Sequence, residues 1–276
     1  MTIAVVGSLN LDLVARVSHF PRPGETLTGA RISRFPGGKG GNQALAAHRL
    51  GAEVYMVGCT GDDPAAVEAV AALKAEGVNL EYCQALAGEA TGLALILVSD
   101  DGENQIVVAP GANAAFPTAS LRIPPVQGMI AQLEVPLQTI ELAATRHQGF
   151  FCLNAAPARP VPASLLRSVD LLIVNELESE CVADALEGFS GLLATTYGSR
   201  GAVLTSGGSE IARARPEPVE AIDTTGAGDA FTAALTVALT AGMDAQAALE
   251  LACKAGAITA TRPGAQSAPT ARELGL

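Results

Sequence analysis

Short apolar runs bounded by turn residues alternate with Ala-, Leu- and Glu-rich segments along most of this 276-residue chain. We predict strands at 3–7, 54–58, 93–98, 129–133, 150–153, 171–174, 192–195 and 202–205. Several are separated by predicted helices at 43–50, 65–76, 136–146 and 176–187. Strands that alternate with helices form a mostly parallel sheet with helices on both faces, because parallel neighbours need a crossover connection. The predicted fold class is therefore α/β.

Two stretches interrupt this alternation and predict a small β-structure beside the main sheet. Residues 13–35 contain Pro21, Pro23 and Gly24 among β-favouring residues, without a helical period. Residues 89–110 have the pattern of a hairpin around a turn at 100–103. We expect these stretches to form a lid, assigned to residues 11–36 and 89–110. No repeat or long linker divides the chain, so a single domain is expected to span residues 1–276.

Composition restricts the class of function. The chain is 49% hydrophobic and 16% charged, which is typical of a compact enzyme. Its net charge of −11 argues against a nucleic-acid surface, although backbone N–H groups can still hold a phosphate in an acidic protein. The cysteines and histidines lack metal-ligand spacing, and no apolar run is long enough to span a membrane. The N-terminal residues resemble a strand and not a signal peptide, so we expect a cytoplasmic protein.

The sequence Asp223-Thr224-Thr225-Gly226-Ala227-Gly228-Asp229 leads into a strongly helical segment. The first N–H groups of a helix lack partners within it and attract anions, and glycines allow close approach. A carboxylate at Asp229 would repel an anion there. Its placement makes sense if it takes a proton from a hydroxyl that attacks phosphorus. The alternative is that Asp229 only caps the helix, and this fragment does not decide between the two. The segment is not a dinucleotide-binding fingerprint, because Phe231 occupies the place of the third glycine.

The N-terminal third carries two polar motifs. Asn10 and Asp12 follow the first strand, and residues two apart on an extended segment point the same way. Asp12 is then able to accept hydrogen bonds from two neighbouring hydroxyls, as in polyol recognition; an ordinary turn is the alternative. The glycine-rich sequence Gly37-Gly38-Lys39-Gly40-Gly41-Asn42 suits close packing on a ligand, with Asn42 near the cap of the next helix. It is no Walker A loop, because Gly40 follows Gly-Lys.

Polar residues also follow the later strands. Glu134 is either solvated or reaches a ligand, and Asn175 either caps the next helix or reaches a ligand. The glycines and hydroxyls at 196–201 suit a turn, and equally the phosphates and ribose of a nucleotide. Because ligands bind at the carboxyl ends of parallel strands, we expect Asn10, Asp12, Glu134 and Asn175 to share one rim.

In this order and spacing, the signals resemble the ribokinase-like (PfkB) family of carbohydrate kinases over nearly the whole chain. Gly38–Asn42 matches the first family signature and Asp223–Asp229 the second, with further matches at 58–63, 111–113, 154–159 and 264–266. The resemblance implies a ribokinase-like three-layer α/β sandwich with a small β-sheet lid. It also implies ATP-dependent transfer of a γ-phosphoryl group to a sugar hydroxymethyl.

We expect the substrate to be D-ribose, phosphorylated on its 5-hydroxyl. Other substrates of the same fold stay open: 2-deoxyribose, a fructose-type ketohexose, a keto-deoxy sugar acid or a nucleoside. A sugar-binding regulator without catalysis is the alternative from another class.

The resemblance also assigns site residues. Asp229 would be the general base, and the N–H groups of Gly226, Ala227 and Gly228 would stabilise the transferred phosphoryl group. The sugar would contact Asn10, Asp12, Gly38, Lys39, Gly40, Gly41, Asn42, Glu134 and Asp229. ATP, with Mg²⁺ bridging its phosphates, would contact Asn175, Thr196, Tyr197, Gly198, Ser199, Arg200, Gly201, Gly228, Asp229 and Cys253.

A monovalent cation site, usually for potassium, is a further implication of the resemblance. Its ligands would be Asp223, Thr225, Thr259, Arg262, Gly264 and Ala268. The family usually has a side-chain hydroxyl where this chain has Ala268, so Ser267 would replace it if the loop shifts by one residue.

Two further expectations concern the flanks and the assembly. Only 22 residues separate Asn175 from Gly198, room for one helix at 177–186, and the chain stops soon after Ala268 without the usual final helix. We therefore expect a trimmed flank near the ATP side. A homodimer through the exposed edges of the lid is also expected, because an uncovered β edge seeks a partner.

Overall fold

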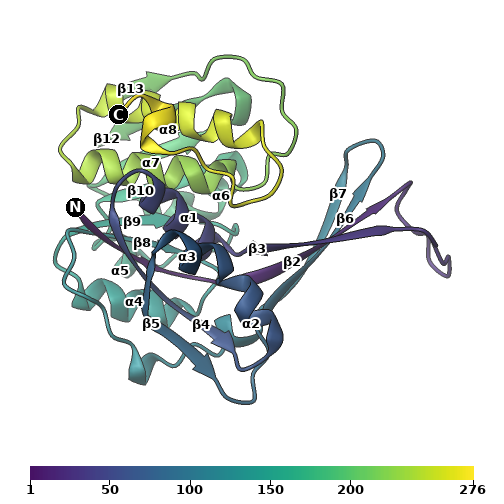
Figure 1. Ribbon diagram of the computed structural model, residues 1–276. Coiled ribbons are helices and arrows are strands. Elements are labelled where there is room, and N and C mark those ends of the chain that lie inside the picture. The colour runs from purple at the N-terminus through teal and green to yellow at the C-terminus, as the bar shows by residue number, and fades with distance from the viewer.

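A nine-stranded sheet with helices on both faces forms the body of the protein, and a four-stranded sheet projects from it (Figure 1). The computed structural model describes all residues, 1–276. The strand order of the large sheet is β13-β12-β11-β10-β9-β8-β1-β4-β5, and all pairs are parallel except β11–β12 and β12–β13. The predicted α/β fold with a mostly parallel sheet is confirmed. The strands are β1 Thr2–Val6, β4 Glu53–Gly61, β5 Asn79–Leu86, β8 Gly128–Gln132, β9 Phe150–Asn154, β10 Leu171–Asn175, β11 Leu192–Thr196, β12 Ala202–Ser206 and β13 Ser209–Ala214.

Side chains of the central strands alternate between two hydrophobic cores. Ile3 and Val5 of β1 point into one core, whereas Ala4 and Val6 point into the other. Burial on both faces explains why these strands have continuous apolar sequences. The first core is covered mainly by α1 Lys39–Arg49, α3 Ala71–Glu76, α7 Ala227–Thr240 and α8 Ala245–Ala260, and the second by α4 Leu137–Arg146, α5 Ala163–Leu166 and α6 Glu176–Val182.

The projecting sheet, which we call the lid, has the strand order β3-β2-β6-β7. Its strands are β2 Asn10–Val17, β3 Arg31–Gly37, β6 Gly92–Ser99 and β7 Asn104–Ala109. β2 pairs with β6 in parallel, and the outer pairs are antiparallel. Every residue of the edge strand β7 is exposed. Because β2 follows β1 after three residues, the lid stands at the carboxyl end of the central strands.

Several element boundaries differ from those expected. α1 begins at Lys39 after Gly38, whose φ is +84°, so Asn42 lies inside the helix and not near its cap. The single helix predicted at 65–76 is divided into α2 Pro64–Ala69 and α3. The edge strands β5 and β13 were not predicted, because neither is a buried apolar run.

The remaining short elements lie mostly between strands. Between Asn175 and Gly198 the chain forms α6, the 3₁₀ turn Ala183–Leu186 and β11. Other 3₁₀ turns are Gly111–Asn113, Thr118–Ser120 and Gly198–Arg200, and the last helix is α9 Ala271–Leu274. None of the helices has the length and apolar character that a membrane crossing requires.

Candidate active site

The carboxyl ends of the central strands and the inner part of the lid enclose a cleft of about 390 Å³. This size suits a small ligand. The predicted residues that line it are Asn10, Asp12, Gly38, Lys39, Asn42, Glu134, Asn175, Thr196, Thr225, Gly226, Gly228 and Asp229. A neighbouring cleft of about 510 Å³ lies between the lid and the segments 221–225 and 263–265.

Asp229 lies in the first turn of α7, with only 6% of its surface exposed. Its Oδ2 accepts a hydrogen bond of 2.9 Å from Asn42 Nδ2, and its Oδ1 accepts one of 2.8 Å from Gln43 Nε2. Burial raises the pKa of Asp229, and Lys39 and the two amides partly oppose the rise. The N-cap of α7 is Gly226, and no side chain makes a capping hydrogen bond. The alternative that Asp229 only caps the helix is therefore wrong.

Gly226 and Gly228, at the start of α7, line the cleft. The N–H groups of Gly226 and Gly228 have no acceptor within the protein, but that of Ala227 donates to Thr224 O at 3.2 Å. The expected contribution of Ala227 to an anion hole is therefore not supported by this geometry. Gly226 has φ +80°, and a Cβ there would lie 2.1 Å from Ala265 O. A Cβ on Gly228 would meet nothing within 4 Å, since this residue borders open space.

Asn10 and Asp12 lie on β2 and are both buried. Asn113 Nδ2 donates to Asn10 Oδ1 at 2.8 Å, which leaves the amino group of Asn10 free to donate into the cleft. The carboxylate of Asp12 packs against Gly37 and receives no hydrogen bond from the protein. Burial, reinforced by Glu134 and Asp229, raises the pKa of Asp12 to about 7. A buried carboxylate without a protein donor is suited to accept hydrogen bonds from ligand hydroxyls.

Glu134 is held by the protein and is not simply solvated. Its Oε2 accepts hydrogen bonds from Ser8 Oγ at 2.5 Å and from the backbone N–H of Lys39 at 3.0 Å. Burial lowers the pKa of the Lys39 ammonium, but Asp229, Glu134 and Glu178 together raise it above its ordinary value. Lys39 is therefore a fixed positive charge among carboxylates.

Gly40 and Gly41 lie behind the cleft and do not line it. A Cβ on Gly40 would lie 2.6 Å from backbone atoms of Gly7 and Ser8, so this glycine lets α1 pack directly on the end of β1. A Cβ on Gly41 would lie 3.3 Å from Gln266 Nε2. Both glycines thus support the position of Lys39 and Asn42.

At the expected nucleotide side, Asn175 caps α6. Its Oδ1 accepts from Glu178 N at 2.8 Å, and the Glu178 carboxylate accepts from Asn175 N at 2.8 Å. Only the amino group of Asn175 stays available to a ligand. Thr196 Oγ1 donates to Val174 O at 3.3 Å.

The outer part of this side lies beyond the cleft. Arg200 pairs with Glu176, and its guanidinium lies over the Tyr197 ring at 5.4 Å. Tyr197, Gly198, Ser199, Arg200 and Gly201 do not line the cleft. Cys253 is buried on α8, with its Sγ 3.8 Å from Ala214 O, and it does not line the cleft either.

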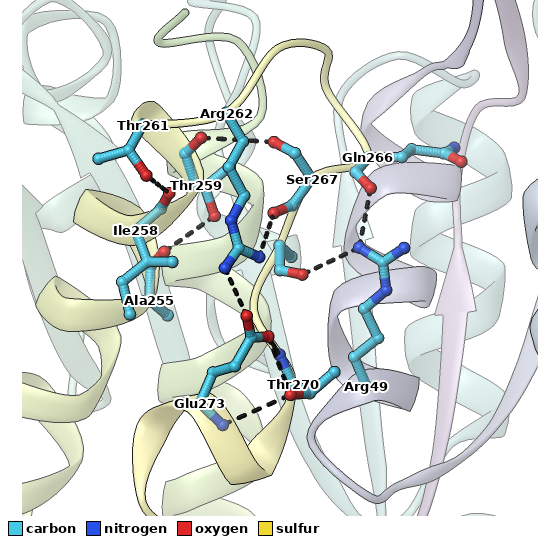
Figure 2. A network of polar contacts seen from close by, with 11 residues as sticks. Arg49, Ala255, Ile258, Thr259, Thr261, Arg262, Gln266, Ser267, Thr270 and Glu273 are labelled. Carbon is cyan, nitrogen blue, oxygen red and sulfur yellow. Dashed lines mark hydrogen bonds and ion pairs between the residues drawn. The ribbon is translucent and has the colours of Figure 1, made fainter. Parts of the chain in front are cut away.

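The expected cation ligands come from two segments: Asp223 and Thr225 precede α7, and the others lie at the end of α8 and in the loop after it. Figure 2 shows this loop with Thr259, Arg262 and Ser267. Ser267 Oγ donates to Gly264 O at 2.7 Å and lies 3.3 Å from Thr259 O, so one hydroxyl and two carbonyls converge. The Asp223 carboxylate accepts from Thr225 N and Gly264 N, both at 2.9 Å. Burial alone would raise the pKa of Asp223, but these hydrogen bonds outweigh it and lower the pKa.

Two expected ligands of this site are engaged elsewhere. The carbonyl of Ala268 accepts a hydrogen bond of 2.9 Å from Arg49, which also pairs with Glu76. The guanidinium of Arg262 pairs with Glu273 at 2.5 Å (Figure 2). The position of Ser267 fits the expectation that it replaces a hydroxyl at Ala268, and the side chain of Arg262 is no ligand.

The sequence did not single out four polar side chains that support the site. Ser8 fixes Glu134, Gln43 contacts Asp229, Gln132 contacts Gln43, and Glu178 faces Lys39. All four are buried. For Ser8 and Gln132 the available signal was a polar residue at the end of an apolar strand run, whereas Gln43 and Glu178 lie within helices and carry no such signal.

The chain belongs to the pfkB family of carbohydrate kinases, whose model matches residues 1–271. It is 37% identical to the ribokinase of Bacillus subtilis, over 99% of this chain and 97% of that protein. The crystal structure of a ribokinase from Thermotoga maritima matches with a TM-score of 0.89 at 30% identity, covering 99% of this chain and 98% of the other. A ribokinase from Arabidopsis thaliana complexed with ribose and ATP matches with a TM-score of 0.86 at 29% identity, covering 99% and 97%.

Proposed function

We propose that this chain transfers the γ-phosphoryl group of ATP to the 5-hydroxyl of D-ribose, giving ribose 5-phosphate and ADP. One observation carries the proposal: a buried carboxylate, Asp229, lies at the N-terminus of α7 and faces a cleft lined by polyol-binding groups. The ribokinases among its relatives and the family membership support the same reaction.

The cleft would orient the sugar. Asp12 accepts hydrogen bonds from two neighbouring hydroxyls, and the amino group of Asn10 donates to a hydroxyl oxygen. Lys39 supplies a positive charge that offsets the carboxylates around the sugar. These contacts direct the hydroxymethyl group toward Asp229.

Asp229 then accepts the proton of the 5-hydroxyl as the oxygen attacks the γ-phosphorus of ATP. A new P–O bond forms, the bond between the γ-phosphorus and the bridging oxygen breaks, and ADP leaves with that electron pair. The unpaired N–H groups of Gly226 and Gly228, at the positive end of the α7 dipole, stabilise the negative charge of the transferred group. The proton remains on Asp229 until the product leaves.

The donor groups present fit the expected ions. Mg²⁺ would be held mainly by the phosphates of ATP, whose charge it would neutralise, and it would need few protein ligands. The carbonyls of Thr259 and Gly264 and the Ser267 hydroxyl are hard oxygen donors that suit a potassium ion. The backbone carbonyls of Asp223 and Thr225 belong to the same proposed site. The hydrogen bond from Gly264 N to the Asp223 carboxylate connects the loop after α8 to the segment that leads into α7.

We also propose a homodimer formed through the lid. Strand β7 is an unpaired edge, and Ile106, Val107 and Val108 along it are exposed, as are Ile32 and Leu95 elsewhere in the lid. An exposed apolar edge is stabilised by a second β-surface. Size-exclusion chromatography with light scattering tests this, and a monomer at micromolar concentration contradicts it. A cytoplasmic location remains part of the proposal.

The other substrates fit less well. A keto-deoxy sugar acid would need an arginine, and a nucleoside would need an aromatic side chain for stacking; the cleft around Asp229 is lined by neither. 2-Deoxyribose would lose one of the two hydroxyls available to Asp12. A regulator without catalysis would not require the buried carboxylate at the start of α7.

The test is ADP release from MgATP with a panel of pentoses, hexoses and nucleosides, each with and without potassium. We expect ribose to give the highest kcat/KM and potassium to increase it. Turnover of another sugar with no turnover of ribose would replace the substrate. Thermal stabilisation by ribose without any turnover would favour a binding protein.

A further inference from the structure

We infer that Gln43 and Gln132 form a positioning relay that holds Asp229 in the orientation and ionisation state needed to accept a proton. This inference rests on the proposed kinase function. Gln43 Nε2 donates to Asp229 Oδ1 at 2.8 Å, and Gln132 Nε2 donates to Gln43 Oε1 at 2.6 Å. Neither glutamine exposes any surface, and Gln43 does not line the cleft, so both act through Asp229 and not on a ligand.

The direction of each hydrogen bond follows from Asp229. An ionised carboxylate accepts hydrogen bonds only, so Gln43 has to present its amino group to Oδ1. The Oε1 of Gln43 then points the other way and requires a donor, which is the amino group of Gln132. Asn154 Oδ1 accepts the remaining hydrogen of Gln43 Nε2 at 3.1 Å. All hydrogen-bonding groups of the Gln43 amide are thus used in the one orientation that favours an ionised Asp229.

The far end of the relay is fixed by the central sheet. Gln132 is the last residue of β8, and its Oε1 has no hydrogen-bond partner. A Cβ on Gly7 would lie 2.0 Å from this oxygen, so glycine at that position leaves the space that Gln132 occupies. A buried amide oxygen without a partner is costly. Its presence indicates that the amino group of Gln132 is needed on the side of Gln43.

The relay counteracts the groups that disfavour the ionised base. Around Asp229 lie Asp12 on β2, Glu134 after β8 and Glu178 on α6, with Lys39 on α1 as the cation. Burial raises the pKa of Asp229, whereas Lys39, Asn42 and Gln43 lower it. Loss of the Gln43 donor removes one of these opposing contributions, so the pKa of Asp229 should rise further.

The experiment compares pH profiles of kcat/KM for wild type, Gln43→Met, Gln132→Met and the double variant. The energy of a hydrogen bond to a charged group corresponds to a pKa change of about one to two units. We therefore expect Gln43→Met to shift the acid limb of the profile to higher pH by about that amount. The KM for ribose should stay within about twofold. Gln132→Met should shift the limb less, and the double variant no further than Gln43→Met, because Gln132 acts only through Gln43.

Thr139→Val is the matched control, since Thr139 is fully buried with an unpartnered hydroxyl on α4, outside the cleft. It should change stability without moving the pH profile. An unchanged acid limb in both glutamine variants, or strictly additive shifts, overturns the inference. If Gln43→Met does not fold, Gln132→Met carries the test alone, and a limb that does not move overturns the inference.

A second readout separates this inference from the proposed function. Carbon-13 NMR of the Asp229 carboxyl reports its pKa in protein that holds no substrate. A higher pKa in the glutamine variants supports the relay whichever sugar is phosphorylated, and an unchanged pKa refutes it. Absence of turnover by the wild type in the kinetic assay would instead refute the proposed function alone, because the NMR measurement requires no turnover.

Discussion

Asp12→Asn is expected to stabilise the ligand-free protein and to weaken its sugar binding. The Asp12 carboxylate is 7% exposed and receives no hydrogen bond from the protein. Its pKa is about 7 in the folded protein against an ordinary value of 3.8. Between these two values the folded state binds more protons than the unfolded state. The free energy of unfolding therefore falls as the pH rises from 4 to 7.

The size of the effect follows from the two pKa values. Linkage gives a destabilisation by ionised Asp12 of about 4 kcal/mol at pH 8 and less than about 1 kcal/mol at pH 4. Asparagine has nearly the same shape and no charge, so it escapes this loss. At about 2–3 °C per kcal/mol for a chain of this size, the Tm should rise by about 8–12 °C at pH 8.

Thermal melts at pH 4 and pH 8 without sugar, with ribose affinity from calorimetry, measure both effects. We expect a large gain in Tm at pH 8, a small gain at pH 4, and ribose binding at least about tenfold weaker, because an ionised acceptor is lost. Asp62→Asn is the control, as the same change at an exposed carboxylate. A variant no more stable than wild type at pH 8, with unchanged ribose affinity, would refute this account of Asp12.

Three further substitutions test other parts of the site. Lys39→Met removes the cation among Asp229, Glu134 and Glu178, so the acid limb of the kcat/KM profile should rise by about one pH unit or more; a profile identical to wild type would contradict this. Ser267→Ala should abolish activation by potassium, whereas Thr261→Val, which removes a hydroxyl bonded to Ile258 O, should retain it in the same titration; equal activation in both would exclude Ser267 as a ligand. Gly226→Ala should lower kcat at least about a hundredfold, because its Cβ would meet Ala265 O and disturb the N–H groups that we propose stabilise the phosphoryl group. Gly242 has the same φ of +80°, but a Cβ there would meet nothing within 4 Å, so Gly242→Ala should cost stability but little activity. Similar kcat losses in both variants would attribute the effect to backbone strain alone.

The sequence predicted what depends on local patterns. Gly226 and Asp229 are recognisable because a glycine turn, a helix start and a carboxylate follow each other within a few residues. The shared rim of Asn10, Asp12 and Glu134 was predictable because parallel strands end at the same edge of a sheet. The alternation of strands and helices likewise determined the fold class.

The parts that were missed depend on contacts between distant segments. Gln43 and Asp229 are 186 residues apart, and Ser8 and Glu134 are 126 apart, so no local pattern pairs them. The use of Ser267 in place of a hydroxyl at Ala268 was foreseen only as an alternative, and the hydrogen bond from Arg49 to Ala268 O was not foreseen. The edge strands β5 and β13 lack the buried apolar run by which the other strands of the large sheet were recognised.

We propose Asp229 as the general base of an ATP-dependent ribose kinase. The most direct measurement is the rate of ribose 5-phosphate formation by wild type and Asp229→Asn at saturating ribose and MgATP, together with ribose affinity from calorimetry. We expect kcat to fall by about two to four orders of magnitude while ribose binding changes only a few-fold, because asparagine keeps the shape but accepts no proton. Turnover of Asp229→Asn within a few-fold of wild type would show that Asp229 is not the general base.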